Sequence, residues 1–147
     1  MKNSLILGVL LHMLFTTTTF SQGNGADGAL TVPAGTTTIN TVKSDVSSTA
    51  SSGQKVVNVT SAAGFATSNL VLIIQMLGTN VGVWEEATIA SISVNAITMT
   101  SNLTNTYTKT GATSLAQVIK IPQYTNVTIA ATRTLTASAW DGTTGGV

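Results

Sequence analysis

One apolar run, LVLIIQM at Leu70–Met76, constrains the fold of this chain more than any other stretch. Six of its seven residues are apolar and three are β-branched, which favours a strand buried on both faces. The run is too short to cross a bilayer, because that takes about 20 apolar residues. It also ends too soon for a typical helix, since residues 78–82 begin and end with glycine. We therefore predict that it is the central strand of a β-sheet.

The composition favours strands in the rest of the chain as well. Charged residues are 7% of the 147 positions, against about 25% in an ordinary domain. Ser, Thr, Ala, Gly and Val take their place, and further β-branched runs occur at 56–59, 118–121 and 127–129. These runs supply apolar surface that a disordered chain lacks. We predict an all-β fold, with a small barrel or sandwich of about six strands over residues 22–122.

The N-terminus has the three parts of a secretory signal peptide. Lys2 supplies the positive charge, Leu5–Phe15 is an apolar core of about 11 residues, and small residues follow. Cleavage after Ser21 would remove residues 1–21 as a helical signal peptide; cleavage after Gln22 is the alternative. A membrane anchor is disfavoured, because the apolar core is too short to span. The mature chain is thus expected to be secreted, extracellular or at the cell surface, with no membrane segment.

Loss of the signal peptide changes the available chemistry. Lys2 is one of six basic residues, so five remain against five acids, and the mature chain is neutral. Nucleic-acid binding is therefore not expected, since it depends on basic side chains that neutralise phosphates. The only histidine, His12, is also removed, and the chain has no cysteine. The mature chain has no Ser-His or Cys-His pair and no thiolate or imidazole metal site, so we do not expect an enzyme.

Strand periodicity predicts two local irregularities and one change of architecture. Within VWEEATIASIS at 83–93, Ile92 breaks the alternation, and a β-bulge near Ala90 and Ser91 would restore it. Val94-Asn95 is predicted to form a tight hairpin turn. From Gln123 onwards, strands of about 5 residues alternate with equally short turns, which is typical of a β-solenoid. We interpret residues 123–147 as the start of a β-helix that is cut short at Val147.

Five segments carry a resemblance to a known family: GADGALTVPAGTTTIN, GFATSNLVLIIQM, ATIASISVNAITM, AQVIKIPQYTNVTI and LTASAWDGTTGGV. Together they resemble the N-terminal region of very large secreted, adhesin-like surface proteins of Gram-negative gliding and particle-degrading bacteria. The resemblance covers nearly all of the mature chain, and its most specific part is PQYTNVTI with LTASAWDGTTGGV. It implies a small β-domain that leads into a Gly-rich β-helix, and it brings no catalytic residues.

Two turns depart from the pattern of that family. Where the family usually has Gly-Asp before the central strand, this chain has Ser68-Asn69. Where it usually has Gly-Asn in the hairpin, this chain has Val94-Asn95. Asparagine tolerates a positive φ, so we expect the asparagines to hold both turns.

Aromatic side chains are the candidates for glycan contact. Trp84, Tyr124 and Trp140, and with them Tyr107, would stack on sugar rings if they shared an exposed face. The alternative for Trp140, which precedes the turn residues Asp141-Gly142, is to plug the end of the solenoid.

Acidic residues offer two further candidate sites. Glu85 and Glu86 are adjacent, but neighbours on a strand point to opposite faces, so they are not the facing pair that glycoside hydrolysis needs. We interpret them as solvated strand charges. GNGADG at 23–28 and DGTTGG at 141–146 imitate half of a calcium-binding solenoid turn. Each occurs once, whereas that mechanism needs several oxygens per ion, so plain turns are the favoured interpretation and calcium the alternative.

The expected role is structural: the chain caps and orients the stalk of a secreted, adhesion-associated surface protein. A solenoid end exposes unpaired backbone that has to be covered. The alternative is a carbohydrate-binding module of an extracellular polysaccharide-active protein. An extracellular matrix or a polysaccharide surface is the expected partner.

Overall fold

The computed structural model describes residues 23–147, in which strands are the regular elements. The all-β class is therefore confirmed, whereas the predicted signal peptide at 1–21 lies outside the described residues. Within 23–147, no helix is long and apolar enough to cross a membrane. The strands are β1 (Ala29–Val32), β2 (Thr36–Ile39), β3 (Lys43–Asp45), β4 (Val56–Asn58), β5 (Leu70–Leu77), β6 (Trp84–Ser93), β7 (Ala96–Met99), β8 (Leu115–Lys120), β9 (Asn126–Ile129) and β10 (Thr134–Ala137).

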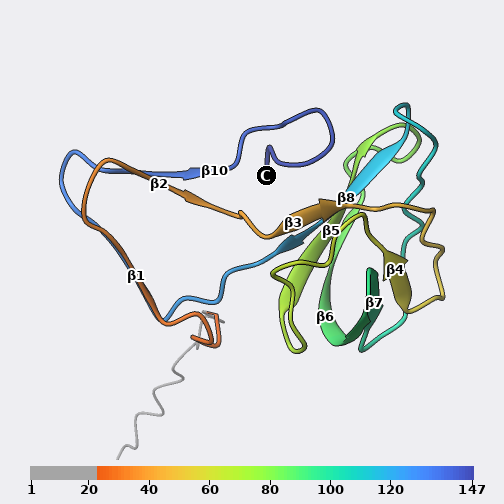
Figure 1. Ribbon diagram of the computed structural model, residues 1–147, viewed down its shortest axis with the longest axis horizontal. Coiled ribbons are helices and arrows are strands. Elements are labelled where there is room, and N and C mark those ends of the chain that lie inside the picture. Colours follow the sequence, from red (N-terminus) through yellow and green to blue (C-terminus); the bar gives the residue numbers. More distant parts are fainter. Residues whose placement is uncertain (1–22) are drawn as a thin grey trace, which may run out of the picture.

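Six of these strands form one antiparallel sheet in the order β3-β8-β5-β6-β7-β4. The sheet curls until its two edge strands meet (Figure 1). Val46, directly after β3, forms a bridge with Val59, directly after β4, and Ser47 N donates to Asn58 O over 2.8 Å. This seam pairs backbone groups that an open sheet would leave free. The predicted barrel of about six strands is thus present.

The central position of β5 is confirmed, but its predicted burial on both faces is wrong. β5 pairs with β6 on one side and β8 on the other. Val71, Ile73 and Gln75 point into the barrel and are fully buried, whereas the alternate residues, among them Leu72 and Ile74, are only half-buried. An apolar residue on the outer face of a barrel keeps part of its surface in water unless another element covers it.

β8 is the strand that is buried on both faces. All five residues from Leu115 to Ile119 are buried. Ala116 and Val118 belong to the barrel core, while Gln117 points outward and is covered by the C-terminal segment, residues 138–147. Gln117 Nε2 donates to Gly145 O over 2.9 Å, and Gly145 N donates to Gln117 Oε1 over 2.7 Å. β8 is therefore buried on both faces because the C-terminal segment, which is distant in sequence, covers its outer face.

The predicted bulge is confirmed. The pairing of β6 with β7 shifts register between Ile89 and Ser91, and Ile89 is fully buried beneath the sheet. Ile92, beyond the shift, packs against the same core. The extra residue turns Ile92 back toward the interior and bends the strand, as a closed barrel requires.

The four remaining strands form two parallel, in-register pairs outside the barrel. β1 pairs with β9 and β2 pairs with β10. In Figure 1, β1 and β2 form the two arms of a bend, and β10 lies beside β2. The pairing of β1 and β2 differs from their expected place in the barrel unit. A parallel pair needs a long crossover connection, and the barrel itself, at residues 43–121, provides it.

We call the two parallel pairs the strand stack: β1 and β2 form its first layer, and β9 and β10 form its second layer. The barrel begins and ends beside the same point of this stack. Lys120 N at the end of the barrel donates to Val42 O at its beginning over 2.9 Å. Asp27 of the stack pairs with Lys120 and accepts a hydrogen bond from Gln123 N over 2.8 Å. Stack and barrel are joined by this ion pair as well as by the chain.

The two unusual turns keep their predicted position but not their predicted mechanism. The positive φ belongs to Ser68 (66°) and Val94 (53°), not to the asparagines that follow them. Asn95 instead fixes the hairpin with its side chain, whose Nδ2 donates to Thr60 O over 3.0 Å. The prediction that asparagine holds the left-handed conformation is therefore wrong at both turns.

Candidate functional site

Trp84 is the most exposed of the predicted glycan-contact residues. It begins β6 and lies opposite Ile74 of β5, whose side chain is on the outer face of the sheet. Trp84 accordingly points outward, and 58% of it is exposed. Along the same face of β6, Glu86 and Thr88 follow at the alternate positions. One face of β6 thus carries an indole ring and then two polar side chains.

A hollow of about 280 Å³ lies over these polar positions of β6. Its walls are residues 85–88 of β6, Leu70 of β5 and the loop 100–103 after β7. Among residues 23–147, the side-chain polar atoms of Glu86, Thr88 and Asn102 have no hydrogen-bond partner, nor have the hydroxyls of Thr100 and Ser101. The hollow therefore offers a carboxylate, an amide and three hydroxyls to a ligand.

Glu85 has a different environment, because it points to the barrel side of the same strand. Its carboxylate accepts hydrogen bonds from Thr104 N (2.9 Å), Thr104 Oγ1 (2.8 Å) and Asn105 N (3.1 Å). Burial opposes ionisation, but these donors outweigh it, so the pKa of Glu85 lies below its ordinary value. Glu85 thus anchors the loop that walls the hollow.

Glu85 and Glu86 point to opposite faces of β6, as their adjacency predicted, so they do not form a facing pair. Glu86 is exposed, in line with a solvated charge. The interpretation is wrong for Glu85, whose carboxylate is a structural hydrogen-bond acceptor.

Trp140 belongs to the C-terminal segment and is 38% exposed. The turn after it is fixed by Asp141, whose Oδ1 accepts from Thr143 N (2.9 Å) and Thr144 N (2.8 Å). These donors hold the pKa of Asp141 below its ordinary range. Lys43 of β3 donates to Asp141 Oδ2 over 3.3 Å and to Thr144 Oγ1 over 2.8 Å. The segment that carries Trp140 is therefore fastened to the barrel.

Tyr124 lies elsewhere, at the junction between stack and barrel. It is half-buried in a small hollow of about 120 Å³ together with Asp27, Asn40 and Lys120. Asp27 and Lys120 are already engaged with each other. The hydrogen bonds from Lys120 and Gln123 N hold the pKa of Asp27 below its ordinary value. Much of the polar capacity of this hollow is thus used within the protein.

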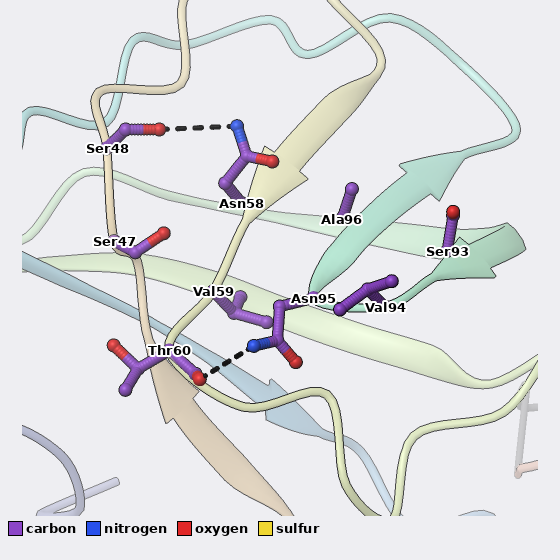
Figure 2. Close-up of a pocket in the computed structure, with 9 residues that line it drawn as sticks. All are labelled: Ser47, Ser48, Asn58, Val59, Thr60, Ser93, Val94, Asn95 and Ala96. Atoms are coloured by element: carbon purple, nitrogen blue, oxygen red, sulfur yellow. Dashed lines mark hydrogen bonds between the residues drawn. The ribbon is translucent and has the colours of Figure 1, made fainter.

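A further hollow, of about 610 Å³, is a shallow groove at the barrel seam. Figure 2 shows the hairpin residues on one side of it and Ser47 and Ser48 on the other. Its two amides are occupied: Asn58 Nδ2 donates to Ser48 Oγ over 3.3 Å, and Asn95 Nδ2 donates to Thr60 O. The groove contains no aromatic side chain, and its amides already have a structural role.

The structure does not place all four predicted aromatic residues on one exposed face. Trp84 and Trp140 are exposed, Tyr124 is half-buried at the junction, and Tyr107 is fully buried. Stacking on Tyr107 is therefore excluded. Sequence reasoning missed the hollow with Glu86 and Asn102, because its wall depends on the loop that Glu85 holds in place.

The two glycine-rich turns use their aspartates as hydrogen-bond acceptors and in ion pairs with lysine. Among residues 23–147, no group of three or more histidine, cysteine, aspartate or glutamate side chains could hold a metal ion.

Comparison with known proteins gives distant structural similarities. No protein family model matches the chain, and no curated protein does. The tailspike gp61 of Pseudomonas phage phi297 is similar with a TM-score of 0.41 and 14% identity, over 66% of this chain and 17% of the tailspike. The gp54 tailspike of Acinetobacter baumannii bacteriophage AP22, in complex with an A. baumannii capsular saccharide, is similar with a TM-score of 0.45 and 12% identity. This similarity covers 75% of this chain and 19% of the tailspike. The chain thus spans less than a fifth of either tailspike.

Proposed function

We propose that this chain is a structural cap at the N-terminus of a secreted, adhesion-associated cell-surface protein. In this proposal the barrel and the first layer, β1 and β2, close one end of a β-solenoid. The second layer, β9 and β10, pairs with the next rung. The support comes from the two parallel pairs, since stacked in-register parallel strands are the repeating unit of a solenoid.

The observation that carries this proposal is a gradient of burial along one apolar column. Residues paired in register in a parallel sheet point to the same side, so Ile129 lies beside Val32 and Val127 beside Leu30. Val32 is fully buried, but Ile129 and Val127 are each 47% exposed. Leu30 is half-buried, so the column is more covered in the β1 layer than in the β9 layer, as we expect of a cap with one open end.

Fusion of soluble β-helix rungs after Val147 tests the proposal. When the fused rungs carry their own C-terminal cap, we expect the fusion to be monomeric, because both ends of its solenoid are covered. The same rungs without the barrel and the first layer should associate through their exposed N-terminal edge. The double substitution Val127→Lys and Ile129→Lys places charges on the open column, and it should return the fusion to the associating state. The measurement is molar mass by light scattering.

Thr128→Lys is the matched control, since Thr128 lies between the two positions on the opposite face of β9. It should leave the fusion monomeric. A fusion that associates as strongly as the bare rungs, or that tolerates the double substitution, would refute the cap.

A further inference from the structure

We propose that the outer face of β6 binds a neutral saccharide, with Trp84 as the platform for a pyranose ring and Glu86 as the acceptor for its hydroxyls. This binding site goes beyond the structural role and does not depend on it.

The platform and the hollow are adjacent and on one face. Trp84 and Glu86 are two residues apart on β6, so their Cα atoms are separated by about 7 Å along the strand. Trp84 is 58% exposed on a strand that pairs with β5 at this position. A ligand that covers the indole would remove apolar surface from water, and the flat apolar face of the ring suits the C–H face of a sugar ring.

The polar groups of the hollow match the rest of such a ligand. Glu86, Thr88 and Asn102, with the hydroxyls of Thr100 and Ser101, line the hollow and lack partners among residues 23–147. A carboxylate accepts from two adjacent hydroxyls, and an amide both donates and accepts. The wall is held in place by Glu85, which binds Thr104 and Asn105. The site is therefore preorganised and needs no rearrangement of the loop.

Two other ligand classes fit less well. The hollow is lined by Glu86, whose carboxylate disfavours phosphate or an acidic polysaccharide. The nearby ammonium of Lys55 donates to Thr100 O over 2.8 Å. A peptide strand could pair only along residues 84–87, the short part of β6 that lies beyond its pairing with β7, because β5 occupies the other edge.

Titration of the full chain with neutral hexasaccharides tests the site. The probes are the hexamers of cellulose, xylan, mannan and chitin, and the readout is the pair of indole N–H resonances, since the chain has two tryptophans. Trp84→Phe assigns the relevant resonance. We expect at least one hexamer to shift the Trp84 signal. Trp84→Ala should weaken the affinity about tenfold or more, and Glu86→Gln should weaken it several-fold.

Val94→Ala is the control, because it removes another exposed apolar side chain from the distant seam groove, and it should leave the affinity unchanged. Thermal melting of Trp84→Ala should match that of the parent, which excludes unfolding as the cause of a loss. The proposal is overturned if none of the four hexamers shifts the Trp84 signal, or if Trp84→Ala binds as tightly as the parent. Shifts seen only with oligolysine, and abolished by salt, would instead assign the face to a cationic partner.

Discussion

At the scale of single residues, each of two turns contains a residue with a Cβ in the left-handed backbone conformation, and the side chain of the next residue helps to hold the turn closed. Ser68 and Val94 adopt positive φ, although each has a Cβ. The left-handed conformation costs about 1 kcal/mol for a residue with a Cβ, and more for a β-branched one. The neighbouring asparagines help to keep both turns closed. Asn69 Oδ1 accepts a hydrogen bond from Ala66 N over 2.9 Å, and Asn95 Nδ2 donates one to Thr60 O over 3.0 Å.

Val94→Gly should therefore stabilise the protein by about 1 kcal/mol. Val94 is 88% exposed, so little packing is lost with its side chain. Denaturant unfolding measures the difference. Asn95→Gly is the matched comparison, and it should destabilise, because Asn95 accepts from Ala62 N over 3.1 Å and donates to Thr60 O. Equal effects of the two substitutions would contradict this division of roles.

The sequence predicted that turns occur at 68–69 and 94–95, because polar or small residues interrupt strand patterns there. It did not predict which residue of each pair has the positive φ. General preferences favour asparagine at positive φ, whereas here each asparagine is fixed by side-chain bonds to segments 3 to 35 positions away. The bond of Asn95 joins positions 35 residues apart, so it exists only in the folded chain.

At the scale of elements, the C-terminal segment covers the outer face of β8. The amide of Gln117 exchanges two hydrogen bonds with the backbone of Gly145, in the way that residues of neighbouring strands do. Gly145 has φ of 100°, and a Cβ there would lie 2.1 Å from Ala139 O. The close fold of residues 138–146 on itself therefore requires glycine at this position.

Gly145→Ala should release the segment from the barrel, since the clash adds to the backbone strain. Gly142→Ala is the matched control: its φ of 102° is nearly the same, but nothing lies within 4 Å of the added Cβ. It should cost only about 1 kcal/mol. Hydrogen exchange at the Gly146 amide, which donates to Ser138 O over 2.8 Å, reports the release. Equal protection in the two variants would contradict the steric argument.

Composition and periodicity located most elements, and they also predicted the bulge between Ile89 and Ser91. They misplaced the burial, because the run at Leu70–Met76 is more apolar than β8 but is less covered. Periodicity reports the preference of a strand itself, whereas coverage of β8 depends on a segment about 28 positions away.

At the scale of the whole molecule, three carboxylates join separate parts to the barrel. Asp27 attaches the strand stack through Lys120, Glu85 attaches the loop at 104–105, and Asp141 attaches the C-terminal segment through Lys43. All three have a pKa below the ordinary value. A group with a depressed folded-state pKa stabilises the fold above its unfolded pKa, about 4, and loses that contribution as the pH falls through the folded value.

The melting temperature should consequently fall as the pH is lowered from about 5 to about 2. Glu85→Gln should lower the melting temperature at pH 7, since the amide replaces one of its acceptor oxygens with a donor. It should also make the dependence on pH shallower, because one of the titrating groups is gone. Calorimetry at several pH values measures both effects. A variant with the same slope as the parent would exclude Glu85 as a source of the acid sensitivity.

The long-range pairing of β1 with β9 and of β2 with β10 was beyond prediction from strand patterns. The two partners are about 97 positions apart, and each of the four strands is only four residues long. The sequence indicated a solenoid only from Gln123 onwards. Recognition of the first layer would have required matching LTV of β1 with VTI of β9 across an entire inserted barrel.

The hydrogen bond between Lys120 N and Val42 O places the entrance and the exit of the barrel side by side. For the path of the chain, the barrel is therefore a bridge between two adjacent points of the layered strands, as a short turn would be. A longer or shorter insertion at this place would leave the register of β1 with β9 and of β2 with β10 unchanged.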